Sequence, residues 1–399
     1  MDRFDRRTFI KGTGIAGLAG LAGCTGGPTG GDDGSGNATT SGGDATSAEG
    51  TSEGTASGGG NESAGNESGS SGEGGSSGED VNVGVVYATG GLGDGSFNDQ
   101  AQQGIQQAES EFGVSYNEAQ PESVSQFKNF QQQFASSTSP SYDLVSCIGY
   151  LQADALGETA PQYPDQSFQI VDSVVDEPNV ASYTFKEHEG SFLAGALAGL
   201  LTTSSFSAGA GQTNEEKSVG FVGGVEGELI GKFEAGYKAG VKHVDDSVEI
   251  QSTYVGAFDD PSGGNEAALS MFNGGADVVY HAAGNTGTGV FRAAQDQGKY
   301  AIGVDRDQSK TKSSYQDVIL ASMVKRVDTA VYNAVEAVVG GNFQGGSATT
   351  LGLQDDGVAL VYGQQLGSEI PSDVKSEIES AREGIIGGDI SVPTDPSNV

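Results

Sequence analysis

Short apolar runs alternate with amphipathic segments along most of this 399-residue chain, from about residue 81 onward. The apolar runs predict strands over residues 83–87, 144–148, 168–172, 218–222, 248–258, 278–282 and 300–304. The amphipathic segments predict helices over residues 99–112, 123–136, 190–201, 229–244, 264–273, 287–297 and 327–339. Continuous apolar strands are typical of parallel sheets that are buried on both faces. Their alternation with helices predicts an α/β architecture built from βαβ units.

Glycines and acidic residues follow several of these expected strands, just before the next helix. They occur in residues 88–94, 223–224, 259–260, 284–287 and 305–307. Ligands of open α/β sheets bind outside the carboxyl ends of the strands, so we expect a site at these turns. The fold alone predicts the place and leaves the chemistry open.

The first 24 residues have the pattern of an export signal. Arg6 and Arg7 open a twin-arginine leader that continues through Phe9 into an apolar stretch over residues 12–23. The stretch is too short to cross a bilayer and ends in Leu-Ala-Gly before Cys24, which resembles a lipoprotein cleavage site. We expect Cys24 to be lipidated as the first residue of the mature chain; the alternative is an unprocessed N-terminal helix.

Residues 25–80 consist almost entirely of Gly, Ser, Thr, Ala, Asn and acidic residues, with no Lys, Arg or aromatic residue. Such a segment buries too little apolar surface to offset the entropy of ordering, so we expect a disordered tether.

Acidic residues dominate the charge of the chain. It has 54 Asp and Glu against 19 Lys and Arg, a net charge of −35. This balance disfavours nucleic acid and anionic membrane surfaces as partners. The acid is spread evenly along the chain, which is typical of the hydrated surface of a halophile's protein.

Motifs of the common enzyme classes are absent from the sequence. There is no Gly-x-Ser-x-Gly elbow, no phosphate loop and no dinucleotide fingerprint. The three histidines are far apart, and Cys147 lies in an apolar run that predicts a buried small hydrophobic residue. His188 stands between Glu187 and Glu189, which we interpret as a solvated surface cluster. We therefore expect no metal, no cofactor and no catalytic activity.

Six stretches, in this order, resemble the basic membrane protein family of substrate-binding lipoproteins of ABC transporters. They are residues 94–98, 185–195, 219–224, 233–241, 301–308 and 322–325. The best understood members of that family bind purine nucleosides. The family usually has Lys where this chain has Gly95.

The resemblance implies the type I periplasmic-binding fold, in which a three-stranded hinge joins two doubly wound α/β lobes. We expect residues 81–186 and 326–350 to form the N-terminal lobe. Residues 187–325 and 351–399 would form the C-terminal lobe, with the last 45 or so residues adding a strand and a helix.

The family fold also implies which residues contact the ligand in the cleft between the lobes. Phe97 would stack on the ligand, with Phe258 as a second ring, and Phe233 would either line the cleft or pack in the core. Asp305 would bind the sugar hydroxyls together with Lys325, a lysine that ends an apolar strand. The full expected set is Asp94, Ser96, Phe97, Asn98, Asp172, Phe233, Phe258, Gly284, Asp305 and Lys325.

Together these features predict a monomeric substrate-binding protein, lipid-anchored on the extracellular face of the membrane. It would capture a nucleoside, with a purine favoured, for an ABC permease. Three alternatives stay open: a sugar or another small polar ligand, a ligand-sensing subunit that does not transport, and a nucleoside hydrolase. The last is disfavoured by the lack of a metal-binding acid cluster or a catalytic histidine.

Overall fold

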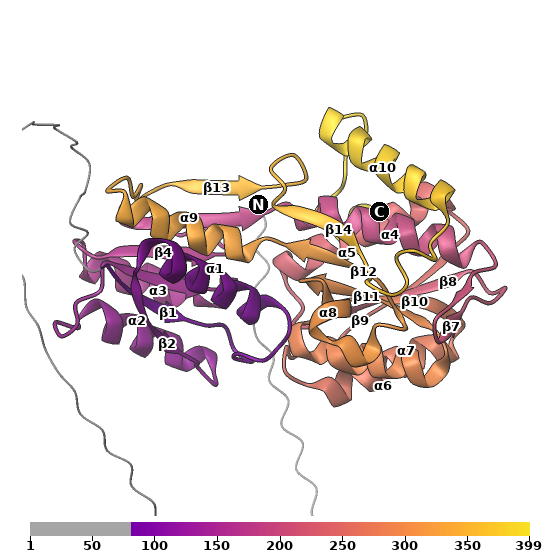
Figure 1. Cartoon of the computed structure of the whole chain (residues 1–399), viewed down its shortest axis with the longest axis horizontal. Helices are drawn as coiled ribbons and strands as arrows, with labels where there is room; N and C mark the ends of the chain where they lie inside the picture. Colours follow the sequence, from indigo (N-terminus) through magenta and orange to yellow (C-terminus); the bar gives the residue numbers. More distant parts are fainter. Residues whose placement is uncertain (1–80) are drawn as a thin grey trace, which may run out of the picture. The chain divides into compact units, whose positions relative to one another are not determined.

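The computed structural model describes residues 81–399, which form two α/β lobes (Figure 1). The first lobe is built on a sheet whose neighbouring strands are all parallel, in the order β13-β5-β4-β3-β1-β2. Its strands are β1 (Asn82–Val86), β2 (Ser115–Ala119), β3 (Leu144–Ile148), β4 (Ser167–Val171), β5 (Val180–Phe185) and β13 (Ala348–Leu351).

Helices cover both faces of this sheet, as the buried central strands require. They are α1 (Phe97–Phe112), α2 (Phe127–Ala135), α3 (Ala153–Thr159) and α9 (Val327–Val339). Helix α1 packs on α9, and α2 packs on α3. Val85 belongs to the same core cluster as Ile105 of α1, whereas its neighbour Val86 belongs to the cluster of Phe127 and Leu156. Successive strand residues thus point to opposite faces, each with its own core.

The second lobe has the sheet order β14-β12-β11-β10-β8-β9, with only β14 antiparallel to its neighbour. Its strands are β8 (Ser218–Gly223), β9 (Glu249–Tyr254), β10 (Ala276–Ala282), β11 (Tyr300–Asp305), β12 (Ile319–Lys325) and β14 (Val358–Tyr362). Its helices are α4 (Glu187–Thr202), α5 (Glu228–Val244), α6 (Pro261–Asn273), α7 (Gly287–Gln297), α8 (Gln308–Thr311) and α10 (Ser372–Gly387). A small hairpin, β6 (Ser207–Ala208) and β7 (Gly211–Gln212), adjoins them.

The two sheets share one strand order, and they differ only in that β13 is parallel to its neighbour whereas β14 is antiparallel. The corresponding strands, first sheet and then second, are β1, β2, β3, β4, β5 and β13, and β8, β9, β10, β11, β12 and β14. Residues that end corresponding strands therefore have equivalent places in the two lobes. Asp172, just after β4, corresponds in this way to Asp305 at the end of β11.

The chain passes between the lobes three times: after Phe185, after Lys325 and between Leu351 and Val358. Backbone hydrogen bonds tie these passages together. The Lys186 N–H donates to the Leu351 carbonyl at 2.9 Å, and the Arg326 N–H donates to the Gly357 carbonyl at 2.9 Å. This two-lobed arrangement of parallel sheets confirms the expected fold class.

Several expected elements coincide with the structure, including residues 144–148, 287–297 and 327–339. The expected strand over residues 248–258 is wrong at its end, because β9 stops at Tyr254 and Gly256 turns the chain with a φ of 89°. The expected helix over residues 123–136 is shorter, since residues 124–126 form a 3₁₀ turn before α2. The last 45 or so residues contain one strand, β14, and one α-helix, α10.

The expected export signal (residues 1–24) and tether (residues 25–80) lie outside the described residues. None of the helices within residues 81–399 is long and apolar enough to cross a membrane.

Candidate functional site

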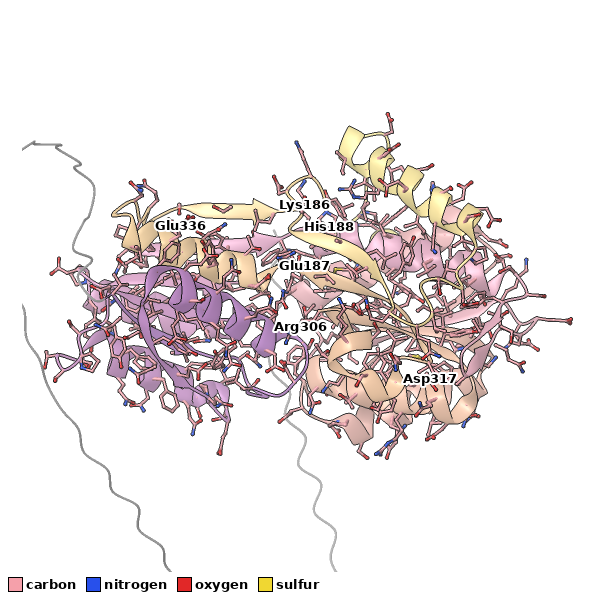
Figure 2. The ribbon with its side chains drawn as sticks, in the orientation of Figure 1. Lys186, Glu187, His188, Arg306, Asp317 and Glu336 are labelled. Carbon is pink, nitrogen blue, oxygen red and sulfur yellow. The ribbon has the colours of Figure 1, made fainter. Side chains whose placement is uncertain are left out.

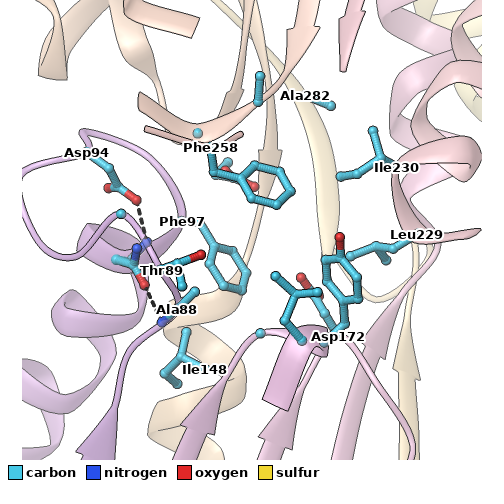
Figure 3. A pocket seen from close by; sticks show the side chains of 18 of the residues that line it. Ala88, Thr89, Asp94, Phe97, Ile148, Asp172, Leu229, Ile230, Phe258 and Ala282 are labelled. Carbon is cyan, nitrogen blue, oxygen red and sulfur yellow. Dashed lines mark hydrogen bonds between the residues drawn. The ribbon is translucent and has the colours of Figure 1, made fainter. Parts of the chain in front are cut away.

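A cavity lies between the two lobes at the carboxyl ends of their strands (Figure 3). About 680 Å³ of space in and around it is free of protein atoms, part of which is open to solvent. Its lining includes nine of the residues expected from the sequence: Asp94, Phe97, Asn98, Asp172, Phe233, Phe258, Gly284, Asp305 and Lys325. Ser96 is the exception, since it does not line the cavity.

Two aromatic rings enter this cavity from opposite lobes. Phe97 is the first residue of α1, and Phe258 lies in the loop after β9. Figure 3 shows both rings pointing into the same space. Glycines make room for them: a Cβ on Gly224 would clash with the Phe258 ring, and one on Gly149 would lie 3.4 Å from Phe97. The site thus offers aromatic faces from both walls.

Phe233 is almost completely buried in α5, yet it also lines the cavity. The alternatives left open by the sequence, cleft or core, are therefore both realised by this one side chain.

Asp172 and Asp305, the equivalent acids of the two lobes, share an unusual backbone conformation. Their φ angles are 69° and 63°, in the left-handed region that residues other than glycine seldom occupy. Both side chains are buried. Strain of this kind costs on the order of 1–3 kcal/mol and concentrates at ligand sites.

Lys325 lies between these acids at the second passage between the lobes. Its ammonium donates to Asp172 Oδ2 at 2.6 Å and lies 3.9 Å from Glu187 Oε1. Burial by itself lowers the pKa of Lys325, but the carboxylates of Asp172, Glu187 and Asp305 outweigh it and hold that pKa above its ordinary value.

Three phenylalanine rings also surround the Lys325 ammonium. Its nitrogen lies 4.8 Å from the centroid of Phe97, 5.4 Å from that of Phe233 and 5.5 Å from that of Phe185. Cations are attracted to aromatic faces at these distances. The ammonium therefore occupies one side of the Phe97 ring.

Ser96 joins the two lobes. Its hydroxyl donates to Asp305 Oδ2 at 2.5 Å, and both residues are buried. Burial raises the pKa of Asp305 to about 6, although Lys325 and the Ser96 hydroxyl act in the opposite direction. Ser96 thus holds a residue that lines the cavity, Asp305, but does not line the cavity itself.

Asp94 and Asn98 form the base of the loop between β1 and α1. Asp94 accepts the backbone N–H groups of Ser96 and Asn98, and Asn98 Oδ1 accepts that of Ala88 at 3.0 Å. These bonds shape the loop that carries Phe97. They leave fewer polar atoms free to meet a ligand than the sequence alone suggests.

The same loop touches the second lobe. The Gly95 carbonyl accepts from Thr311 Oγ1 at 2.9 Å, and Arg306 donates to Gln103 Oε1 at 3.0 Å. A Cβ on Gly95 would lie 2.5 Å from Lys312 Cε, so this lysine fills the space beside the glycine. The lobes are therefore closed over the cavity.

The interpretation of Glu187, His188 and Glu189 as a solvated cluster is wrong. The chain passes between the lobes at Glu187, where α4 begins (Figure 2). Glu187 is fully buried and Glu189 is nearly so. Burial raises the pKa of Glu187 to about 7, although Lys325 acts in the opposite direction. Glu189 accepts the Leu353 N–H at 2.9 Å and pairs with Lys186.

Tyr150, Leu229 and Ile230 also line the cavity, and the sequence did not predict them. Tyr150 lies two residues beyond the last residue of β3, at the carboxyl end of that strand, which is where the fold predicts a site. Leu229 and Ile230 look like ordinary core positions of a helix. No group of residues within 81–399 has the makeup of a metal site, and Cys147 is buried, as expected.

Residues 81–395 match the family described as "ABC transporter substrate-binding protein PnrA-like", Bmp. The chain belongs to this family. It is a solute-binding protein of the ABC-transporter type and not an enzyme.

Named relatives and solved structures agree with this membership. The chain is 38% identical to the CD4+ T-cell-stimulating antigen of Listeria monocytogenes, over 80% of this chain and 89% of that protein. It is 33% identical to the ABC transporter nucleoside-binding protein BmpA of Lactococcus lactis, over 79% and 90%. A solved ABC transporter solute-binding protein from Aeropyrum pernix is 29% identical with a TM-score of 0.70, over 79% of this chain and 95% of that one.

Proposed function

We propose that this protein captures a nucleoside, preferably a purine, in the cavity between its lobes. The observation that carries the proposal is the pair of rings, Phe97 and Phe258, that line one cavity from opposite lobes. A purine is a flat, polarizable plate, and stacking of a base on one aromatic side chain contributes about 1–3 kcal/mol. The name of the Lactococcus relative, a nucleoside-binding protein, supports the same ligand class.

The polar groups of the cavity suit the sugar of such a ligand. Asp305 would accept from the ribose hydroxyls, and Lys325 would donate to a sugar oxygen. Both side chains are buried, so their hydrogen bonds to a ligand would form away from water. Asp94 and Asn98 would meet the base edge with the atoms that their loop leaves free.

Binding would work by closure of the lobes. The three passages of the chain form the hinge, and a ligand that contacts both walls favours the closed state over the open one. The protein would then present its ligand to a permease of the transporter.

The amino terminus would place the protein outside the cytoplasm. Cys24 would carry the lipid anchor after twin-arginine export, and residues 25–80 would tether the lobes to the membrane surface. Replacing Cys24 by Ser should release the protein from the membrane fraction. Continued membrane association of that variant would contradict the anchor.

Calorimetric titration of the full chain, carrying Cys24→Ser for solubility, tests the ligand class. Adenosine, guanosine, inosine and ribose are titrated separately in high salt. At least one nucleoside should bind much more tightly than ribose, because only the nucleoside has a plane to stack. Binding of ribose without any nucleoside would overturn the proposal.

A further inference from the structure

Tyr150 has a buried hydroxyl that the proposed function does not use. Tyr150 begins the turn after β3 and lines the cavity on the side of the first lobe. Its hydroxyl oxygen is buried and has no hydrogen-bond partner among residues 81–399. A buried polar atom without a partner costs about 1–3 kcal/mol, so its presence in a binding cavity requires an explanation.

A second such atom lies nearby. Asp172 uses Oδ2 to accept from Lys325, but its Oδ1 is buried and likewise has no partner within the described part of the chain. Burial and the charge of Asp172 raise the pKa of Tyr150, whereas Lys325 lowers it. All three residues line the same cavity. The cavity wall therefore combines one phenol with a carboxylate and an ammonium that are bonded to each other.

The chemistry of these three groups restricts what they can bind together. Asp172 Oδ1 only accepts, the Lys325 ammonium only donates, and a phenol does both. A hydroxyl group satisfies all three kinds of partner, since it donates one hydrogen bond and accepts others. A phosphate or carboxylate would instead face Asp172 with no proton to donate.

The burial of the Tyr150 hydroxyl and Asp172 Oδ1 affects how easily the lobes close. With the lobes as they stand, the Tyr150 hydroxyl and Asp172 Oδ1 are buried, so closure is unfavourable unless a ligand supplies the missing hydrogen bonds. In an open state both atoms would be hydrated at no cost. A ligand hydroxyl at this position would therefore favour closure directly.

We propose that Tyr150 is a ligand-binding residue that, together with Asp172 and Lys325, binds a sugar hydroxyl of the nucleoside. The inference rests on the proposed function and names the part of the ligand that these three residues recognise. It assigns the hydroxyl to the first lobe and the hinge, beside the contact expected from Asp305.

The test is Tyr150→Phe, which removes one oxygen and keeps the ring. Tyr237→Phe is the matched control, because the Tyr237 hydroxyl is also buried without a partner among residues 81–399 but lies in the core and does not line the cavity. Both variants should fold as stably as the wild type, since each loses only an unpaired buried hydroxyl.

The variants are titrated with the tightest of adenosine, guanosine and inosine, with its 2′-, 3′- and 5′-deoxy analogues and with the free base. Tyr150→Phe should weaken the nucleoside about 5- to 100-fold, the effect of one unmet buried hydrogen bond. It should leave the free base unaffected. For one of the deoxy analogues, the loss of affinity from Tyr150→Phe and the loss from the missing hydroxyl should not add, because both changes remove the same contact. Tyr237→Phe should leave every affinity unchanged.

Several outcomes would overturn the inference: an unchanged affinity of Tyr150→Phe, an equal loss on the free base, or additive losses with all three deoxy analogues. A wild-type chain that binds none of these ligands would refute the proposed function itself, and the inference with it. The titration of the wild type separates these cases before any variant is examined.

Discussion

Lys325 is the residue on which the charges of the cavity converge. It carries one positive charge, while Asp172, Asp305 and Glu187 supply three buried carboxyl groups around it. Isolated charges are costly to bury, and the cost falls when some of the carboxyl groups hold protons. The pKa values of Glu187 and Asp305 are accordingly raised, to about 7 and about 6, which favours their protonated, neutral forms.

Glu187→Gln should change how stability depends on pH. The ordinary pKa of a glutamate is 4.5, and that of Glu187 in the folded protein is about 7. A carboxyl whose pKa is raised by folding contributes stability that is complete below the unfolded value and is lost as pH rises through the folded value. The wild type should therefore lose this contribution between about pH 4.5 and pH 7, whereas glutamine does not titrate.

Thermal unfolding of both proteins at pH 5, 6, 7 and 8 measures the effect. The melting temperature of the variant minus that of the wild type should become more positive as pH rises. Asp305 remains in both proteins, so its titration cancels in the difference. A difference that stays constant across this range would show that Glu187 does not titrate there.

Phe258→Ala should weaken nucleoside binding by about 1–3 kcal/mol, the contribution of one stacked ring. Phe258 is the better ring to remove, because Phe97 also contacts the Lys325 ammonium. Phe112→Ala is the control: that ring pairs with Tyr332 at 5.4 Å on the first lobe and does not line the cavity. Calorimetry should show weaker nucleoside binding for Phe258→Ala and unchanged binding for Phe112→Ala. Equal affinity of the two variants would show that Phe258 does not stack on the base.

Nine of the residues that line the cavity were predicted, and the family resemblance is what singled them out. Asp305 also lies in a turn, residues 305–307, that was expected to carry a site because it follows a strand. The hydrogen bond of Ser96 with Asp305 could not be predicted from the sequence, because it joins positions 209 residues apart. Glu187 was misinterpreted because charge alone suggests solvent, whereas its burial depends on where the chain passes between lobes.

At the scale of elements, the packing of α4 on α5 depends on glycines. A Cβ on Gly240 would clash with the Phe192 carbonyl, and one on Gly195 would clash with the Tyr237 carbonyl. The two helices therefore approach at backbone distance beneath the sheet of the second lobe. Their first turns carry Glu187 and Leu229, so this packing also positions one side of the hinge and cavity.

Gly240→Ala should lower stability by about 1–3 kcal/mol, the usual cost of forcing an extra methyl group into a packed interface. Gly157→Ala is the matched control, because Gly157 lies in α3 with no atom within 4 Å of an added Cβ. That control should be neutral or gain roughly 0.5–1 kcal/mol from the better helix propensity of alanine. Denaturant unfolding measures the free energy of unfolding of both variants. Equal changes in the two would mean that α4 and α5 can move apart to accommodate the extra methyl group at little cost.

The elements found from the sequence are those with strong apolar periodicity. Strand β3 is buried throughout and was predicted to the residue. Strands β2 and β13 were missed because they are edge strands, mostly exposed, whose polar residues do not alternate with apolar ones. Their place is fixed by pairing with β1 and β5, which a local pattern does not record.

The molecule as a whole combines closed lobes with a strongly negative charge. Contacts of Ser96 with Asp305, Thr311 with Gly95 and Arg306 with Gln103 join the lobes on one side of the cavity. The net charge of −35 acts against any compact state through repulsion. We expect this surface to suit a halophile's surroundings.

Salt should therefore stabilise the protein. The Debye length falls from about 10 Å at 0.1 M salt to about 3 Å at 1 M, so repulsion among surface carboxylates is screened. The melting temperature of the full chain should rise steadily from 0.1 M to 2 M KCl. A melting temperature that is constant or falls over this range would contradict a surface adapted to high salt.

A crystal structure of the protein with its tightest nucleoside tests the central claim most directly. We predict that the base lies between Phe97 and Phe258, with the sugar toward Lys325, Asp172 and Asp305. A base bound elsewhere, with the two rings packed against protein instead, would contradict the account.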